Sequence, residues 1–200
     1  MDQGSLLSHF EGGDPLVRKE IDMRDSRLKR LQKDFEGMEG LRKQSGGVLD
    51  FSVSSDLEHY NVRINGVPGI KGTTARNKVI TDSYEFDIEL PAEYSDHKPN
   101  VTFEEPLFHP NCWPSGILCF DWTPSTTLRD LVIDVVRFIN YQTVNLDSIA
   151  NPNAGEWYQK NEFRIRELLR EAEFPPNPDE GLVIYDGSSD ELIITEERRL

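Results

Sequence analysis

The chain has 200 residues and a formal net charge of −14 at pH 7, with 36% hydrophobic and 29% charged residues. This composition is typical of a soluble domain with a sizeable core, and the acidic balance argues against a nucleic-acid partner, because phosphate backbones require a basic face. No apolar run approaches the roughly 20 residues that span a bilayer, so no membrane partner is expected. The N-terminus lacks the basic-then-apolar pattern of a signal peptide, which predicts a reducing, cytoplasmic location. The two cysteines do not supply the four ligands of a structural zinc site, so we expect no metal and no cofactor.

The first half of the chain predicts a leader, one helix and a sheet. Residues 1–20 mix Gly, Ser, Asp and Pro and predict a flexible leader. Between residues 21 and 41 apolar side chains recur at helical spacing, which predicts a helix. Four strand-like runs follow, and their short polar connections favour an antiparallel meander: Val48–Ser54, His59–Ile64, Ser83–Leu90 and Val101–Phe103.

The second half predicts further helices. A strong apolar stripe over residues 128–139 predicts a helix, and Thr126 or Thr127 is placed to cap its start. Another helix is predicted from Ala154 to about Glu173, where a proline-rich run stops it. This order of elements predicts an α+β domain over residues 21–173.

The tail, residues 174–200, differs from the rest of the chain. It is acidic and contains two short apolar runs, Leu182–Tyr185 and Leu192–Thr195, separated by Gly187-Ser188-Ser189. The pattern fits a short hairpin, a docking segment or a disordered acidic tail equally well.

Cys119 lies in a segment that suits a covalent thiol. The segment reads His109-Pro110-Asn111-Cys112-Trp113-Pro114-Ser115-Gly116-Ile117-Leu118-Cys119. Such a thiol needs neighbours that stabilise charge in the transition state and a backbone that leaves it open to solvent. Asn111 offers an amide donor, and Gly116 lets the chain turn. On composition alone, a small buried cysteine is the commoner interpretation.

The order of the motifs resembles the ubiquitin-conjugating (E2) enzymes over about residues 26–172. Cys119 falls where their thioester-forming cysteine sits, and further matches flank it in order: Tyr60 with a Gly-rich turn at 66–69, Leu90-Pro91, Tyr94, 99–103, His109-Pro110-Asn111, Trp122, Pro124 and 147–154. The resemblance implies the UBC-like fold, with an N-terminal helix, a four-stranded antiparallel meander sheet and C-terminal helices.

The resemblance also implies a reaction. Cys119 would accept ubiquitin or a ubiquitin-like modifier from an E1-like activating enzyme as a thioester, which is reactive toward amines yet survives in water. Asn111 would donate its amide to the oxyanion formed when an amine attacks, or would hold the active-site loop rigid. A turn residue bonded to its own backbone is the structural alternative for Asn111.

Other residues of the segment receive lesser roles from the resemblance. Ser148, in an acidic stretch with Asp147, would gate and orient the incoming lysine. His109, next to Pro110, is expected to bond to nearby backbone rather than to transfer protons. Tyr158 is expected either beside the cysteine pocket or, as an ordinary tyrosine, in the core.

The resemblance places partner surfaces on the first helix and on two loops. Four basic residues match the E1-contacting face of the family, and a solvated run of charges is the alternative interpretation: Arg27, Lys29, Arg30 and Lys33. Asp96 stands where the family commonly has an aromatic contact for RING-type ligases, while Pro124 keeps the family residue. Loss of the aromatic anchor predicts weak stimulation by generic RING ligases and a dedicated E3 or direct transfer instead.

One departure and two rival functions remain. Only Phe120-Asp121 separate Cys119 from Trp122, where many family members carry several more residues, so the rim beside the thiol is shortened. A non-catalytic E2-like module that binds a modifier is the first rival, and the presence of Cys119 argues against it. A thiol hydrolase is the second rival, but it requires a histidine beside the sulfur, and no histidine follows Cys119 in the chain.

Overall fold

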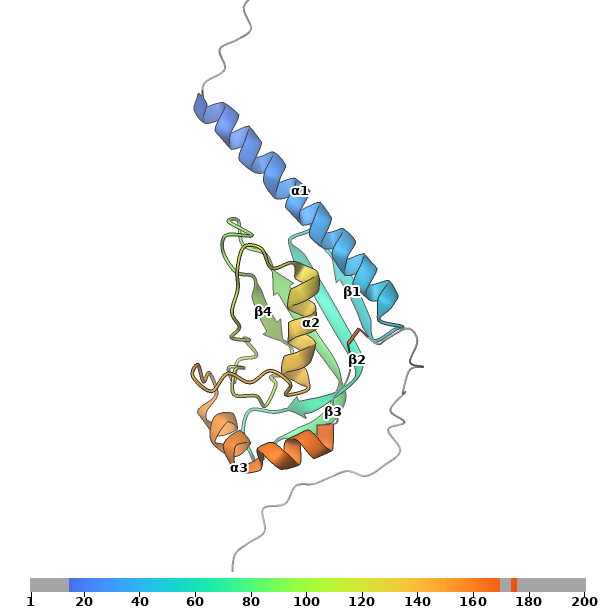
Figure 1. The fold of residues 1–200 in the computed structure, drawn as a ribbon, viewed down its shortest axis with the longest axis vertical. Coiled ribbons are helices and arrows are strands. Elements are labelled where there is room, and N and C mark those ends of the chain that lie inside the picture. The colour runs from blue at the N-terminus through green and yellow to red at the C-terminus, as the bar shows by residue number, and fades with distance from the viewer. Residues whose placement is uncertain (1–14, 170–173, 176–200) are drawn as a thin grey trace, which may run out of the picture.

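The fold is a four-stranded antiparallel meander packed against helices, as Figure 1 shows. The structure is a computed structural model, and it describes residues 15–169 and 174–175. The elements in chain order are α1 (Pro15–Gln44), β1 (Leu49–Val53), β2 (His59–Lys71), β3 (Val79–Glu89), β4 (Asn100–Phe103), α2 (Leu128–Ile139) and α3 (Pro152–Leu169). The sheet order is β1-β2-β3-β4 with every pair antiparallel. This arrangement confirms the predicted α+β class and its order of elements.

The main core lies between one face of the sheet and the two helices α1 and α2. Inward-facing strand residues such as Val62 and Phe86 are fully buried, whereas their neighbours along the strands are polar. The apolar stripe of α2 packs onto this face, and α1 lies against α2 and β1. The apolar residues that alternate along the strands therefore pack in one core against the apolar face of α2, whose residues recur with a period of about 3.6.

Helix α1 is longer than the sequence pattern predicts. It begins at Pro15 rather than near residue 21, so the last six residues of the predicted leader (1–20) are helical. Proline is tolerated in the first turn of a helix, because the N–H that it lacks has no partner there. The helix ends at Gln44, and Gly46 and Gly47 follow with positive φ angles of 62° and 99°. Residues 1–14 lie outside the described part of the chain.

The glycines at 66–69 do not form the turn that the sequence predicts. Strand β2 continues through them to Lys71, with a shift of register between Asn65 and Gly69, and the pairing with β3 extends to Val79. A Cβ added at Gly69 would lie 2.4 Å from the Ile139 carbonyl oxygen. Gly69 is therefore required because the end of α2 packs directly on the strand, and the predicted turn is a bulge.

The predicted start of α2 is confirmed in detail. Thr127 caps the helix through a capping box, in which its hydroxyl accepts from the Asp130 amide and the Asp130 carboxylate accepts from the Thr127 amide. Helix α3 ends at Leu169 within the described residues. Of the tail, the structure describes residues 174 and 175, and Phe174 packs against the main core. The rest of the acidic tail (176–200) lies outside the described residues, so its predicted hairpin stays a prediction.

Candidate active site

The structure separates the two thiols of the candidate segment. Cys112 is fully buried in the main core, and burial raises the pKa of its thiol to about 12. This thiol is therefore protonated and inert at neutral pH. Cys119 is partly exposed and free of any disulfide. Cys119 is thus the thiol that a partner protein can reach.

A tight hairpin presents Cys119 at the edge of the sheet. The Trp113 amide donates to the Ile117 carbonyl and the Gly116 amide donates to the Trp113 carbonyl, both at 2.8 Å. Gly116 has a φ of 94°, and a Cβ at this position would lie 2.3 Å from the Phe103 carbonyl oxygen. Only glycine fits this close approach to β4. The requirement for Gly116 fixes the distance between the hairpin and the sheet, and with it the place of the thiol.

Asn111 joins the Cys119 segment to the loop that follows α2. Its backbone carbonyl accepts from the Cys119 amide at 2.8 Å. Its side-chain nitrogen donates to the carbonyls of Asn145 and Ser148 at 2.7 and 2.8 Å, and its side-chain oxygen accepts from the Asn145 amide at 2.8 Å. With 1% of its surface exposed, Asn111 has every side-chain N–H engaged in this loop. Before any modifier is bound, the geometry therefore favours the role of Asn111 in holding the loop over its role as an oxyanion donor.

His109 is built into the core. It is completely buried, its Nδ1 accepts from the Asn111 amide at 3.0 Å, and its Nε2 lies 3.1 Å from the Thr143 carbonyl oxygen. A ring that accepts at one nitrogen and donates at the other is neutral. Burial lowers its pKa from 6.5 to about 3, so it stays neutral through the physiological range. This matches the expectation of backbone hydrogen bonding rather than proton transfer.

The buried His109 predicts a pH-dependent stability. Between its folded pKa of about 3 and its unfolded pKa of 6.5, the unfolded chain binds one more proton, so stability is lost as pH falls through this window. The contribution to the free energy of unfolding has a slope of up to about 1.4 kcal/mol per pH unit. Urea unfolding from pH 7.5 to 4.5 measures it, and His109→Gln should flatten the slope. His97→Gln, at a largely exposed histidine, should not, and equal slopes in all three proteins would contradict this prediction.

The remaining predicted site residues fall into two groups. Asp147 and Ser148 are exposed in the loop held by Asn111, so this loop carries the predicted gate to the neighbourhood of Cys119. Pro110 is buried, and its carbonyl accepts from the Ala150 and Asn151 amides at 2.8 and 2.9 Å. Tyr158 instead stacks on a buried tyrosine, Tyr141, in a second apolar cluster. Tyr158 is therefore a core residue, the commoner of its two interpretations.

Of the four basic residues predicted for E1 binding, two are exposed and two are bonded to other parts of the chain. Lys29 and Lys33 are exposed and help to line a shallow groove on α1, together with Leu28, Gln32, Glu36 and Leu57. Arg27 instead donates to the carbonyls of Pro91 and Ala92 at 3.0 Å and pairs with Glu58 at 2.9 Å. Arg30 is also bonded within the chain. E1 binding by this face stays a prediction, and the two lysines are its most accessible members.

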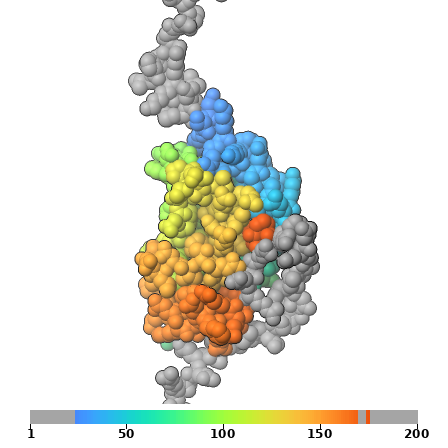
Figure 2. All heavy atoms as spheres, viewed as in Figure 1, coloured from blue at the N-terminus to red at the C-terminus, as the bar shows by residue number. Residues whose placement is uncertain are grey.

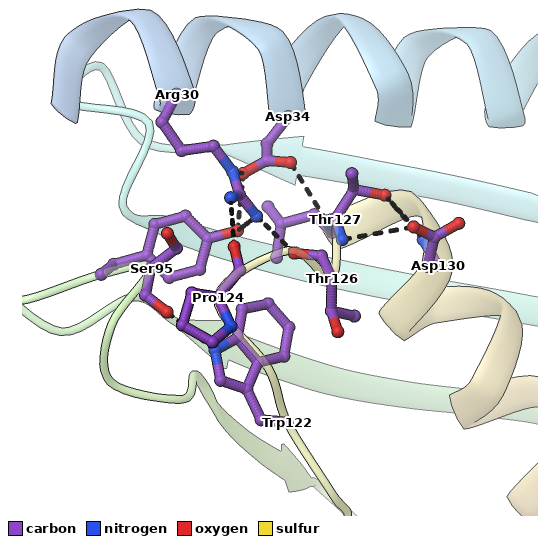
Figure 3. A network of polar contacts seen from close by, with 10 residues as sticks. Arg30, Asp34, Ser95, Trp122, Pro124, Thr126, Thr127 and Asp130 are labelled. Carbon is purple, nitrogen blue, oxygen red and sulfur yellow. Dashed lines mark hydrogen bonds and ion pairs between the residues drawn. The ribbon is translucent and has the colours of Figure 1, made fainter. Parts of the chain in front are cut away.

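A buried carboxylate, Asp34, ties α1 to both predicted ligase loops (Figure 3). Its side chain is fully buried and accepts from Arg30 Nε at 2.6 Å, the Tyr94 hydroxyl at 2.6 Å and the Leu128 amide at 3.2 Å. Arg30 also donates to the carbonyls of Pro124, at 2.8 Å, and Thr126. Figure 2 shows the three segments side by side at one end of the molecule, with α1 in blue and the two loops in green and yellow. The hydrogen bonds of Asp34 and Arg30 thus connect the predicted E1 surface on α1 to the predicted E3 surface on the two loops.

The loop residues predicted to meet ligases are accessible. Asp96 and Pro124 are both exposed, one in the loop between β3 and β4 and the other in the loop before α2. The Trp122 indole donates to the Ser95 carbonyl at 2.9 Å and its ring packs on Tyr94, so the two loops form one surface. A carboxylate in place of an aromatic anchor remains the reason to expect weak binding of generic RING ligases.

We expect Asp34→Ala to lower the free energy of unfolding by about 3–5 kcal/mol, the usual loss when one partner of a buried ion pair is removed. The buried Tyr94 hydroxyl and the first-turn amide of α2 would lose their acceptor. Glu36→Ala, at an exposed position of the same helix, is the matched control and should change stability by less than about 0.5 kcal/mol. Denaturant unfolding compares the two, and similar losses would show that the network adds little.

Two residues of this region have roles that were not predicted from the sequence. Trp113 donates its indole N–H to the Cys119 sulfur at 3.1 Å, and the sequence offers only proximity along the chain as a signal. Asp34 gives a clearer signal, because it lies between Leu31 and Met38 on the apolar face of the helix. A charged residue on a buried face indicates a paired carboxylate.

Over residues 15–169 and 174–175, no group of three or more His, Cys, Asp or Glu side chains is placed to hold a metal ion. No helix in that part of the chain is long and apolar enough to cross a membrane.

Comparison with known proteins identifies the class. The family model described as "Ubiquitin-conjugating enzyme" matches residues 30–173. The "Probable ubiquitin-conjugating enzyme E2 17" of Arabidopsis thaliana is 28% identical over 138 residues, which cover 66% of this chain and 77% of that protein. The "SUMO-conjugating enzyme UBC9" of Caenorhabditis elegans is 29% identical over 111 residues, which cover 52% of this chain and 63% of that protein.

The chain therefore belongs to the ubiquitin-conjugating enzyme (E2) family. Its class is that of a transferase in ubiquitin-like conjugation, and the family works with E1 enzymes, ubiquitin-like modifiers and E3 ligases.

Proposed function

We propose that this protein accepts ubiquitin or a ubiquitin-like modifier from an E1-like activating enzyme as a thioester on Cys119 and transfers it to an amine. The observation that carries the proposal is the contrast between the two thiols of the family's active-site segment. Cys112 is buried and protonated, whereas Cys119 is accessible on a rigid hairpin. A thiol is suited to this task because its ester remains reactive toward amines.

The reaction has two acyl transfers. In the first, the Cys119 thiol loses its proton to solvent and its sulfur attacks the thioester carbonyl that the E1 carries. A new carbon–sulfur bond forms, the bond from the carbonyl carbon to the E1 sulfur breaks, and the E1 thiolate leaves. In the second, an acceptor amine attacks the carbonyl held on Cys119. The carbon–nitrogen bond forms, the carbon–sulfur bond breaks with its electron pair going to sulfur, and the amine loses its proton to solvent. Neither step consumes a redox equivalent, and both need a thiol that stays reduced, so we also propose a cytoplasmic site of action.

The residues around Cys119 suit the second step. Asn111 holds the loop that carries Asp147 and Ser148, so this loop keeps a fixed position beside the thiol segment. An ordered gate lowers the entropy cost of placing an amine for attack. We propose that the Ser148 hydroxyl helps to orient the incoming amine. A hydroxyl does so more weakly than a carboxylate, so we expect this gate to select less strictly among amines.

The thiol-hydrolase alternative has little support in the geometry. Of the histidines in the described residues, His109 is buried and bonded to backbone, while His59 and His97 are exposed on β2 and in the loop after β3. None of these three is bonded to the Cys119 sulfur. A general base within hydrogen-bond reach is the first requirement of that mechanism.

Charging by an E1 tests the proposal. The full chain is incubated with ATP and candidate E1–modifier pairs, and the products are separated on non-reducing gels. We expect an adduct one modifier larger than the chain that requires both E1 and ATP and disappears on addition of reductant. Absence of any adduct across ubiquitin and the ubiquitin-like modifiers, each with an E1 that charges its own control E2, would refute the proposal. The responding pair also identifies the modifier.

A further inference from the structure

The Trp113 side chain is the polar neighbour of the proposed nucleophile. Its indole Nε1 lies 3.1 Å from the Cys119 sulfur and donates its hydrogen to it. We infer that Trp113 is a catalytic residue whose N–H stabilises the Cys119 sulfur when that atom carries negative charge. The inference rests on the proposed function, because it assigns the charged sulfur to the two acyl transfers.

The hairpin holds the backbone of Trp113 in place before any reaction begins, and the indole is bonded to the Cys119 sulfur in this resting state. The backbone amide and carbonyl of Trp113 are both bonded, to Ile117 and Gly116 respectively. The hairpin is in turn fixed to β4, since the Phe103 amide donates to the Gly116 carbonyl and the Leu118 amide donates to the Val101 carbonyl, each at 2.9 Å. A donor fixed in advance needs no reorganisation when charge develops, which is the condition for effective electrostatic stabilisation.

The chemistry of the indole suits a sulfur that alternates between nucleophile and leaving group. An indole N–H donates a hydrogen bond but does not accept a proton, so it stabilises the thiolate without acting as a base. In the second transfer the carbon–sulfur bond breaks and its electron pair goes to the sulfur. The same N–H then stabilises the departing thiolate, because hydrogen bonds to ionised acceptors are stronger than those to neutral ones.

Within the described residues, no other side chain is hydrogen bonded to the Cys119 sulfur. Its backbone amide is also committed, since it donates to the Asn111 carbonyl. The side-chain donor at the sulfur is thus a neutral indole and not a histidine base of the kind that a hydrolase requires. The N–H of Trp113 is thus placed to account for the stabilisation of the sulfur on its own.

Trp113 also exposes apolar surface, which suggests a simpler role as a contact for the modifier. Trp113 is 47% exposed, and Ile117 on the same hairpin is 46% exposed. The two residues are therefore a matched pair, in which only Trp113 has the N–H. Ile117→Ala removes exposed apolar surface beside the thiol and leaves the bond to sulfur intact, so it separates surface contact from hydrogen bonding.

The test compares wild type, Trp113→Phe and Ile117→Ala in the full chain. The first measurement needs neither E1 nor modifier: iodoacetamide alkylates the protein at pH 7, and mass spectrometry follows the Cys119 peptide. Trp113→Phe loses a hydrogen bond to the charged sulfur, so a smaller fraction of Cys119 is thiolate. The less stabilised thiolate is a somewhat better nucleophile, which offsets part of this loss. We therefore expect alkylation to be about 3–10-fold slower in Trp113→Phe. Ile117→Ala should react at the wild-type rate.

The second measurement is single-turnover discharge of the charged protein to free lysine. We expect Trp113→Phe to discharge about 3–10-fold more slowly than wild type, with Ile117→Ala close to wild type. A wild-type rate of alkylation in Trp113→Phe, or equal slowing by both variants, would overturn the inference. If wild type is never charged by any E1, the proposed function fails, whereas the alkylation rates still decide whether Trp113 stabilises the sulfur. Thermal unfolding of each variant confirms that the hairpin is folded.

Discussion

Replacing Cys119 with alanine should abolish formation of the modifier adduct. The alanine variant has no sulfur to accept the acyl group, and the other cysteine cannot replace it, because Cys112 is buried and its thiol has a pKa raised to about 12. Cys119→Ser should give either no adduct or an oxygen ester that resists reductant, since a hydroxyl forms the more stable ester. E1- and ATP-dependent charging followed on gels with and without reductant measures all of these outcomes.

The matched control for this prediction is Cys112→Ala. This variant should still be charged, since it removes only a buried thiol in the core. It should lose some stability, about 1 kcal/mol for a small cavity, so charging is measured well below its unfolding temperature. An adduct of wild-type amount in Cys119→Ala would show that the family motif has been aligned to the wrong residue, and loss of charging in Cys112→Ala alone would point to the same error.

The sequence predicts the fold because its periodicities are clear. Alternation along β3 and the stripe of α2 each identify the buried face, and the structure places both faces in one core. What the periodicities do not predict is where the chain approaches itself closely. Gly69 reads as a turn residue in the sequence, yet it is needed because the end of α2 packs on β2. Such a contact depends on two segments far apart in the chain, so it has no local signal.

The site shows the same division between local and distant contacts. The order of motifs predicts that Cys119 and Asn111 lie in one segment, and the structure joins them through a backbone hydrogen bond. The sequence does not predict the inward bonding of Arg30, because a basic residue on a helix reads as a solvated charge until its partners are known. Its partners are a buried carboxylate on the same helix, the Tyr94 hydroxyl and two carbonyls of the loop before α2, so they come from three separate segments.

This bonding has a consequence for the study of partners. Because Arg30 supports the two loops that are predicted to meet ligases, a change at Arg30 alters both predicted surfaces at once. Lys29 and Lys33 are exposed on the same helix and leave the network intact. Substitutions at these two lysines are therefore the ones that test E1 binding by α1 without disturbing the loops.

Asn111→Ala should leave charging by E1 nearly intact and slow discharge of the modifier to free lysine by about 10–1000-fold, a range that covers both release of the loop and loss of an oxyanion donor. The substitution removes both donors and the acceptor that hold the loop of Asn145 and Ser148 beside the thiol segment. Charging does not require an ordered gate for an amine, whereas aminolysis does. Single-turnover discharge in a range of lysine concentrations measures the effect, and charging under the same conditions provides the comparison.

The loop-holding role and the oxyanion role of Asn111 give different results in a second experiment. If Asn111 acts by holding the loop, Asn111→Ala should speed hydrogen exchange at the Asn145 amide, which loses its acceptor. Discharge should then be slowed together with this faster exchange. Ser148→Ala is the matched control, because it keeps the backbone carbonyl that Asn111 binds and should leave that exchange unchanged. Slow discharge with unchanged exchange at Asn145 would assign Asn111 to the oxyanion instead. A charging defect as large as the discharge defect would show that the substitution disturbs the whole segment around Cys119.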